Sequence, residues 1–252
     1  MAGNMEGMSQ MQCPGKREGT GQSAPPKADS GRDRGAGLYG TSGHGAAPDG
    51  TEPPAGIGAG LTATVMFCGI EGFSRIPDDF SPDLLMLLLN EHHAAMTSAL
   101  FEHEGALDQC RGDELIAVFG GMSSMEEDAL RCVRAAVTMA ARNHELNALR
   151  RKKGLPVFGL GLGICTGEVV VGHIGASAFR KMTVVGETVA VARRLCSLAM
   201  PGQILAAEAT YRLVASRVRG KAAGSLTRRP DTNPIKAYAI DGVLEEKMLV
   251  CR

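Results

Sequence analysis

The sequence contains no tryptophan, and aromatic side chains make up only 4% of its 252 residues. Lysine plus arginine and aspartate plus glutamate both total 27, so no net charge attracts nucleic acid or an anionic lipid surface. A nucleic-acid site would also need aromatic side chains interleaved with basic ones. Neither composition nor charge therefore indicates a nucleic-acid partner.

Long apolar runs are also missing. The strongest run, Leu84 to Leu89, is far shorter than the roughly 20 residues that a membrane-spanning helix needs. The N-terminus lacks the basic start and apolar stretch of a secretory signal. The seven cysteines are odd in number and form no CxxC pair, a usage typical of reduced thiols. We therefore expect a cytoplasmic protein with no membrane span in this chain.

Residues 1–60 are rich in Gly, Pro, Ser and charge, with hardly any aromatic or β-branched residues. Such a segment buries too little apolar surface to offset the entropy of ordering it. We expect a disordered tail over 1–60, a folded domain over 61–241 and a short C-terminal tail over 242–252.

Hydrophobic periodicity and turn residues predict the elements of the folded region. In order, they are a strand over 61–70, a helix over 82–103, strands over 105–110 and 114–120, a helix over 124–151, strands over 156–167 and 168–175, a helix over 187–198, a strand over 203–207 and a helix over 207–216. Ser124 and Glu127 form a capping box for the second helix, and Thr166-Gly167 is expected to be a turn. This order predicts an α+β fold: a ferredoxin-like βαββαβ core with extra β-β-α-β elements, a mostly antiparallel sheet, and helices on one face.

"GLGLGICTG" looks like a dinucleotide-binding fingerprint, but that motif needs a helix to open at its last glycine, and here a strand follows. We interpret Gly159, Gly161 and Gly163 as places where a helix packs closely on the sheet, or as a curved strand.

The histidine pair is interpreted as part of a solvated helix face, and the basic cluster as a helix C-terminus. The adjacent His92 and His93 point about 100° apart on a helix, so they cannot chelate one ion together. The basic cluster "LRRKKG" at 149–154 is expected at a helix C-terminus, where cations complement the helix dipole.

Four segments stand out as a set: "FCGIEGFS", "GALDQCRGDELIAVFG", "GICTGEVVVGHIG" and "TVVGETVAVARRLCSLAMPGQILAAEAT". In order and spacing they resemble the catalytic domain of class III adenylate and guanylate cyclases over about residues 61–241. The resemblance implies a role in cyclic-nucleotide signalling, with ATP or GTP as ligand and Mg²⁺ or Mn²⁺ as cofactor. Such cyclases join the ribose 3′-oxygen to the α-phosphate with the help of two divalent ions.

In this family two aspartates hold the ions, because Mg²⁺ prefers carboxylate and phosphate oxygens. The second of them corresponds to Asp113. The first falls at Gly69, which has no side chain, although the strand still runs into a glycine-containing turn. Glu71 is an imperfect replacement, since in an extended segment it is displaced by roughly 6 to 7 Å.

The resemblance also implies that the backbone of Ile70, Gly72, Phe73 and Ser74 forms a cradle for the triphosphate, because backbone N–H groups in a turn of this kind can approach phosphate oxygens.

The remaining family positions lie on the third helix and around the base. The ribose-orienting Asn falls at Ala190, whereas the transition-state Arg corresponds to Arg194, whose planar donors suit charge on a phosphate. The alternative interpretation is that Arg194 simply belongs to the exposed side of this helix. The purine-contacting Lys corresponds to Gln109 and its partner to Thr183. Glutamine both donates and accepts, so adenine and guanine remain possible.

The resemblance finally implies sites formed across a dimer interface, with metal ligands from one subunit and the Asn and Arg from the other. A homodimer would lack one carboxylate and the Asn in both sites, whereas a heterodimer could restore part of a site. Three hypotheses remain: a degenerate domain that binds a nucleotide or regulates a partner, an active adenylate or guanylate cyclase, and a purely structural dimerisation module.

Overall fold

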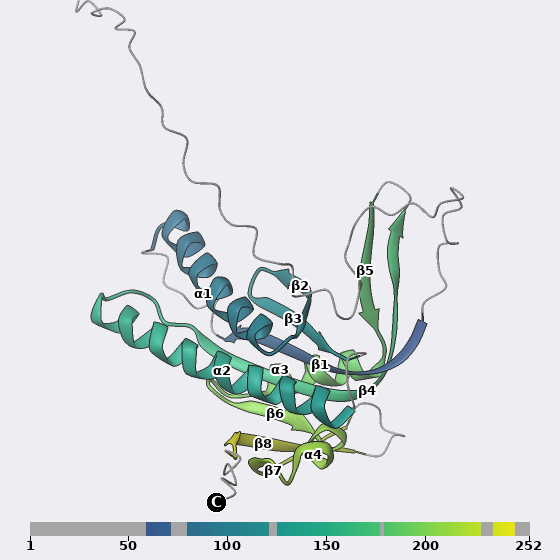
Figure 1. The fold of residues 1–252 in the computed structure, drawn as a ribbon. Coiled ribbons are helices and arrows are strands. Elements are labelled where there is room, and N and C mark those ends of the chain that lie inside the picture. Colours follow the sequence, from purple (N-terminus) through teal and green to yellow (C-terminus); the bar gives the residue numbers. More distant parts are fainter. Residues whose placement is uncertain (1–58, 72–79, 121–124, 177–178, 228–233, 245–252) are drawn as a thin grey trace, which may run out of the picture. The chain divides into compact units, whose positions relative to one another are not determined.

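The computed structural model describes residues 59–71, 80–120, 125–176, 179–227 and 234–244. In chain order they form β1 (Ala59–Glu71), α1 (Pro82–Glu102), β2 (Ala106–Arg111), β3 (Glu114–Phe119), α2 (Met125–Lys152), β4 (Gly159–Ala176), β5 (Phe179–Val185), α3 (Glu187–Leu198), β6 (Ile204–Ala207), α4 (Glu208–Val214), β7 (Val218–Leu226) and β8 (Ile235–Val243) (Figure 1). The α+β fold and its three longer helices are confirmed.

The strands form a single sheet in the order β2-β3-β1-β4-β6-β8-β7, and β5 pairs with β4 outside this path. Only the β4–β6 pair is parallel among these pairings, so the predicted mostly antiparallel sheet is confirmed. The long strands β1 and β4 pair from Ala59 opposite Val171 to Glu71 opposite Gly159. They form the centre from which the site is built.

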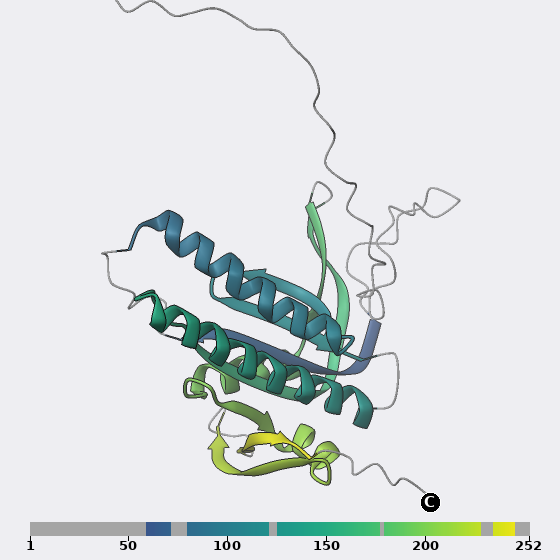
Figure 2. The same ribbon diagram turned by 60° about the vertical axis from the view of Figure 1, so that its left-hand side comes forward.

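Helices cover both faces of the sheet. On one face α1 and α2 lie side by side, and their buried residues join Met66 and Cys68 of β1 in one core cluster (Figures 1 and 2). On the other face Leu195 of α3 packs in a second cluster with Val65 and Phe67. Because successive strand residues point to opposite faces, β1 supplies both cores. The prediction that the helices share one face was therefore wrong for α3.

The backbone of α3 lies close to β4 at the glycines of "GLGLG". A Cβ on Gly163 would stand 2.2 Å from the backbone oxygen of Ala192 and from the backbone nitrogen of Cys196. A Cβ on Gly161 would stand 3.1 Å from the carbonyl oxygen of Cys196. The interpretation of these glycines as a helix-packing surface is confirmed.

The strand β4 continues without a turn through Thr166 and Gly167, so the prediction of two strands joined there was wrong. Both residues pair with β1, at Thr64 and Ala63. The Thr166 and Thr64 hydroxyls lie 2.8 Å apart, and a Cβ on Gly167 would stand 2.7 Å from Oγ1 of Thr188 in α3. Gly167 therefore marks a close helix contact rather than a turn.

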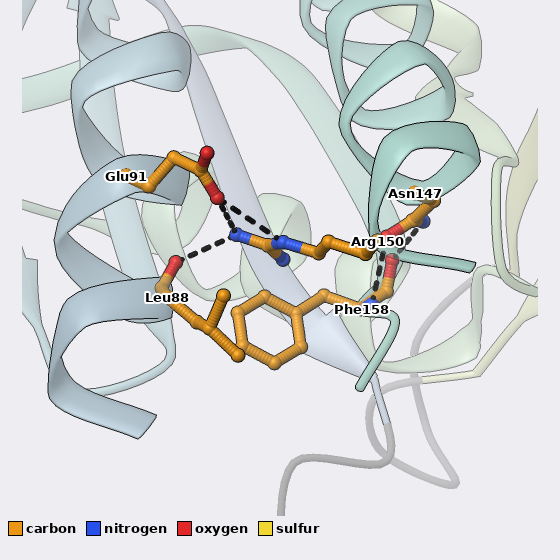
Figure 3. Close-up of polar contacts among 5 residues, drawn as sticks. All are labelled: Leu88, Glu91, Asn147, Arg150 and Phe158. Carbon is orange, nitrogen blue, oxygen red and sulfur yellow. Dashed lines mark hydrogen bonds and ion pairs between the residues drawn. The ribbon is translucent and has the colours of Figure 1, made fainter. Parts of the chain in front are cut away.

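Arg150 in the basic cluster is buried rather than solvated. Its Nη2 donates to the Leu88 carbonyl oxygen at 2.7 Å and to the Glu91 carboxylate at 2.8 Å (Figure 3). Its guanidinium carbon lies 4.4 Å from the centre of the Phe158 ring. The prediction that the basic cluster ends a helix is confirmed, since Arg150 lies in the last turn of α2. Arg150 is nevertheless buried, because α1 packs beside this end of α2.

His92 departs from its prediction. It is only 1% exposed and packs edge-on against Phe158, with ring centroids 5.6 Å apart. His93 lies 2.8 Å from the carbonyl oxygen of Gly112 through its Nε2. The two histidines therefore serve packing and loop contacts rather than a solvated face.

The predicted tail over 1–60 lies outside the described residues except for Ala59 and Gly60, which begin β1. In the C-terminal tail, Gly242 and Val243 end β8, and residues from 245 onwards lie outside the described part. Every helix in the described ranges is too short or too polar to cross a membrane.

Candidate active site

The end of β1 meets the turn between β2 and β3. Gly69 pairs with Glu114, and the Ile70 amide donates to the Asp113 carbonyl oxygen at 2.9 Å. The Asp113 side chain is exposed, and Gly112 before it has a φ of 60°, which glycine adopts without strain. The sheet thus brings Asp113 beside Gly69.

The predicted phosphate cradle is described only in part. The Ile70 N–H is already used in its bond to Asp113, and the Ile70 side chain is buried. Gly72, Phe73 and Ser74 lie outside the described residues, so their contact with a triphosphate stays a prediction.

An open pocket of about 500 Å³ lies between these strand ends and α3. Ala190 and Arg194, one helical turn apart, both line it and are exposed. Arg193 lines it as well and pairs with Glu114 at 3.0 Å, which links α3 to β3. The Arg194 guanidinium makes no polar contact within the described ranges, so it is available to an anionic ligand.

The thiol of Cys196 occupies the space beside Gly69. A Cβ on Gly69 would stand 3.1 Å from the Cys196 sulfur, closer than ordinary van der Waals contact. The same thiol lies 3.4 Å from the Gly161 carbonyl oxygen, to which it donates. Burial, followed by the carboxylates of Glu114 and Glu71, raises the pKa of Cys196 to about 12. Cys196 therefore stays protonated at neutral pH and packs between Gly69 and β4.

The carboxylates around the pocket fit a two-ion centre poorly. Asp113 offers one carboxylate without a polar partner in the described part of the chain, whereas Glu114 is held by Arg193. Glu71 also lines the pocket but stands two residues beyond Gly69. Within the described ranges, no group of three or more His, Cys, Asp or Glu could hold a metal ion. Beside Asp113, Gly69 supplies no carboxylate for a second ion.

The two predicted base-reading residues lie in contact. Gln109 on β2 donates from Nε2 to the Thr183 hydroxyl on β5 at 3.2 Å. The Thr183 hydroxyl in turn donates to the Asp108 carboxylate at 2.9 Å. Gln109 also lines a second pocket, of about 460 Å³, whose walls include Phe67, Ile116 and Val189.

Sequence reasoning missed three residues of this region: Asp108 behind Thr183, Cys196 beside Gly69, and Arg193 on Glu114. Each acts through a partner distant in sequence. Only Asp108 carried a local signal, as a carboxylate inside an apolar strand next to a base-reading residue.

The chain was compared with known proteins. A family model for the adenylate and guanylate cyclase catalytic domain matches residues 61–242. Adenylate cyclase 1 of Rhizobium meliloti is 28% identical over 183 residues, which cover 72% of this chain and 28% of that protein. The chain thus spans less than a third of that relative.

Solved structures agree. The guanylyl cyclase Cya2 matches with a TM-score of 0.69 and 29% identity, covering 76% of this chain and 97% of that one. A non-canonical dimeric guanylyl cyclase domain of the RhoGC fusion protein, from Blastocladiella emersonii, matches with a TM-score of 0.64 over 74% of this chain and 99% of that one. At 20% identity, this second match shows the fold alone.

The fold, with a polar pocket between strand ends and a basic helix, defines a nucleotide cyclase catalytic domain. The chain belongs to the class III adenylate and guanylate cyclase catalytic domain family, whose members use divalent metals. The predicted family is confirmed.

Proposed function

We propose that this domain is a degenerate cyclase domain, which binds ATP or GTP and acts as a regulatory partner in a dimer while turning over little nucleotide itself. The observation that carries the proposal is Gly69. It lies near the end of β1, opposite Glu114 and close to the turn that carries Asp113, and the Cys196 thiol fills the space on its side-chain face.

The metal centre is the first loss. Two bound divalent ions would supply activation of the ribose oxygen and neutralisation of the leaving pyrophosphate; Asp113 could hold them in part, and Gly69 offers no second carboxylate. Mg²⁺ demands nearly ideal geometry, so Glu71 at a displaced position is a poor substitute. Mn²⁺ tolerates such a site better.

The orienting amide is the second loss. Ala190 lies one helical turn before Arg194 on the pocket side of α3 and offers no hydrogen bond to a ribose. Loss of a metal carboxylate and of an orienting group each costs on the order of 10² in rate. Together these losses favour binding without efficient turnover.

Other family positions keep side chains that can contact a nucleotide. Arg194 lines the first pocket and makes no polar side-chain contact within the described residues. Gln109, which bonds to Thr183, lines the second pocket, where Phe67, Ile116 and Val189 offer apolar surface to a base and Arg111, Glu114 and Arg193 add charge. A relative with this fold is described as dimeric, which supports a homodimer or a heterodimer with another cyclase domain. In a heterodimer, Arg194 would be this chain's contribution to a partner's site.

Cyclase activity of the purified chain tests the proposal. We expect little cyclic product from ATP or GTP with either Mg²⁺ or Mn²⁺, but measurable nucleotide binding by calorimetry. Product at an ordinary cyclase rate would favour the active-cyclase alternative.

Restoring the lost groups is the sharper test. Gly69→Asp returns the carboxylate, and Cys196→Ala makes room for it, so the double variant should raise product formation by on the order of 10² in Mn²⁺. Ala190→Asn added to this pair should raise it further, since residues of one catalytic unit act non-additively.

Cys196→Ala alone is the matched control and should leave activity at the wild-type level. A wild-type rate that the double variant Gly69→Asp, Cys196→Ala does not improve would contradict the proposal. A folded triple variant that neither binds Mn²⁺-nucleotide nor forms product would instead indicate a purely structural module.

A further inference from the structure

Asp108 precedes the base-reading Gln109 in the segment "GALDQC", and a β-bulge connects it with both base-reading residues. Leu107 pairs with Ala117, and Gln109 pairs with the next residue of β3, Ile116, so Asp108 is the extra residue of the bulge. In a regular strand, side chains 108 and 109 would point to opposite faces. The bulge lets both reach the Thr183 hydroxyl on β5.

The direction of these hydrogen bonds follows from chemistry. Asp108 and Thr183 are both only 7% exposed. A carboxylate accepts hydrogen bonds and does not donate them, so the single Thr183 proton goes to Asp108. The Thr183 oxygen can then only accept from Gln109. The nitrogen end of the Gln109 amide must therefore face Thr183, and its carbonyl oxygen faces away.

This orientation decides what Gln109 offers to a ligand. The residue lines the pocket of about 460 Å³ beside Phe67, Ile116 and Val189, which suit the faces of a flat heteroaromatic ring. An unconstrained glutamine can turn to present either a donor or an acceptor. A glutamine held through Thr183 presents its carbonyl oxygen, an acceptor.

We propose that Asp108 is a positioning residue for base selection: through Thr183 it holds Gln109 so that the pocket prefers a purine with a 6-amino group over one with a 6-oxo group. The amino group donates to the Gln109 oxygen, whereas an oxo group would place two acceptors together. This inference rests on the proposed function, in which the domain binds a purine nucleotide.

The proposed base selection is tested by competition binding to the full chain in the presence of Mg²⁺. The affinities for ATP and for inosine triphosphate are compared, because the bases of these nucleotides differ at the 6-position. The wild type should bind ATP about tenfold more tightly or better. Thr183→Val removes the hydroxyl and frees Gln109, so the ratio should fall to about threefold or less. Thr183→Ser keeps the hydroxyl and should retain the wild-type ratio. Asp108→Ala removes the acceptor of the Thr183 proton, so Thr183 can donate to Gln109 instead and the ratio should fall as it does in Thr183→Val.

The ratio separates positioning from a structural role, because a merely structural change weakens both nucleotides alike. Should Asp108→Ala fail to fold, the Thr183 pair decides the question. A wild type that binds both nucleotides equally, or a Thr183→Val ratio equal to that of the wild type, overturns the inference and leaves the proposed function standing. Absence of binding by any purine triphosphate overturns both.

Discussion

At the scale of single residues, neighbours that are distant in sequence decide the chemistry. His92 and His93 are adjacent in the chain, yet His92 is buried against Phe158 while His93 contacts the Gly112 carbonyl oxygen. The pKa of His92 is lowered to about 3, mainly by burial and in addition by the nearby His93 and Arg150. His92 therefore stays neutral in the folded protein at any physiological pH.

This shift predicts a pH dependence of stability. An unfolded histidine titrates at about 6.5, so between that pH and about pH 3 the unfolded chain binds a proton that folded His92 does not. The free energy of unfolding should therefore fall as pH drops through this window, by up to about 1.4 kcal/mol per pH unit from this residue.

Urea unfolding between about pH 7 and pH 4 measures the effect. His92→Leu should have a flatter profile than the wild type, whereas His144→Leu, at an exposed position of α2, should not. Parallel profiles for the wild type and His92→Leu would contradict this prediction.

At the scale of elements, the position of α3 matters most, because this helix presents Ala190 and Arg194 to the pocket. The glycines of β4 allow its close approach, and Gly163 allows the closest. The position of α3 on the sheet, and with it the geometry of the pocket, therefore depends on the absence of a side chain at position 163.

Gly163→Ala tests this dependence. The added methyl would stand 2.2 Å from two backbone atoms of α3, so helix and sheet must separate. We expect a loss of about 1–3 kcal/mol or more in the free energy of unfolding, measured with urea. Gly60→Ala is the control, since nothing lies within 4 Å of its added methyl, and it should stay within about 0.5 kcal/mol of the wild type. Equal stability of both variants would contradict the packing argument.

At the scale of the whole molecule, the outer part of β4 and its partner β5 form an arm that extends from the sheet (Figure 1). Val170, Ile174 and Val185 stand on this arm with exposed fractions of 42%, 55% and 44%. Val170 and Val185 are register partners, so their exposed side chains are neighbours. Gathered apolar side chains of this kind are typical of protein interfaces.

We therefore predict self-association through the arm. Ile174→Gln should weaken the dimer by about tenfold or more in dissociation constant, measured by sedimentation equilibrium. Leu87→Gln, at a position of α1 that is 64% exposed, is the matched control and should leave the dissociation constant unchanged. An equal effect of both substitutions, or a monomeric wild type, would count against the arm as the interface.

The sequence by itself determined the features that depend on local pattern. Periodicity located α1, α2 and α3, and motif order identified the cyclase family. Motif spacing matched Asp113 and Gly69 to the two metal positions, and the structure places them together because the β2–β3 hairpin pairs with β1.

Only the tertiary structure decided how distant segments meet. Periodicity placed no strand over β5. It also split β4 at Thr166-Gly167, because a glycine required by a helix contact looks the same in sequence as one required by a turn. The burial of Arg150, the Cys196 thiol beside Gly69 and the bulge at Asp108 follow from packing across the sheet. Local propensity does not encode such contacts. They stabilise the protein only after α1 has packed against α2, and α3 against β4.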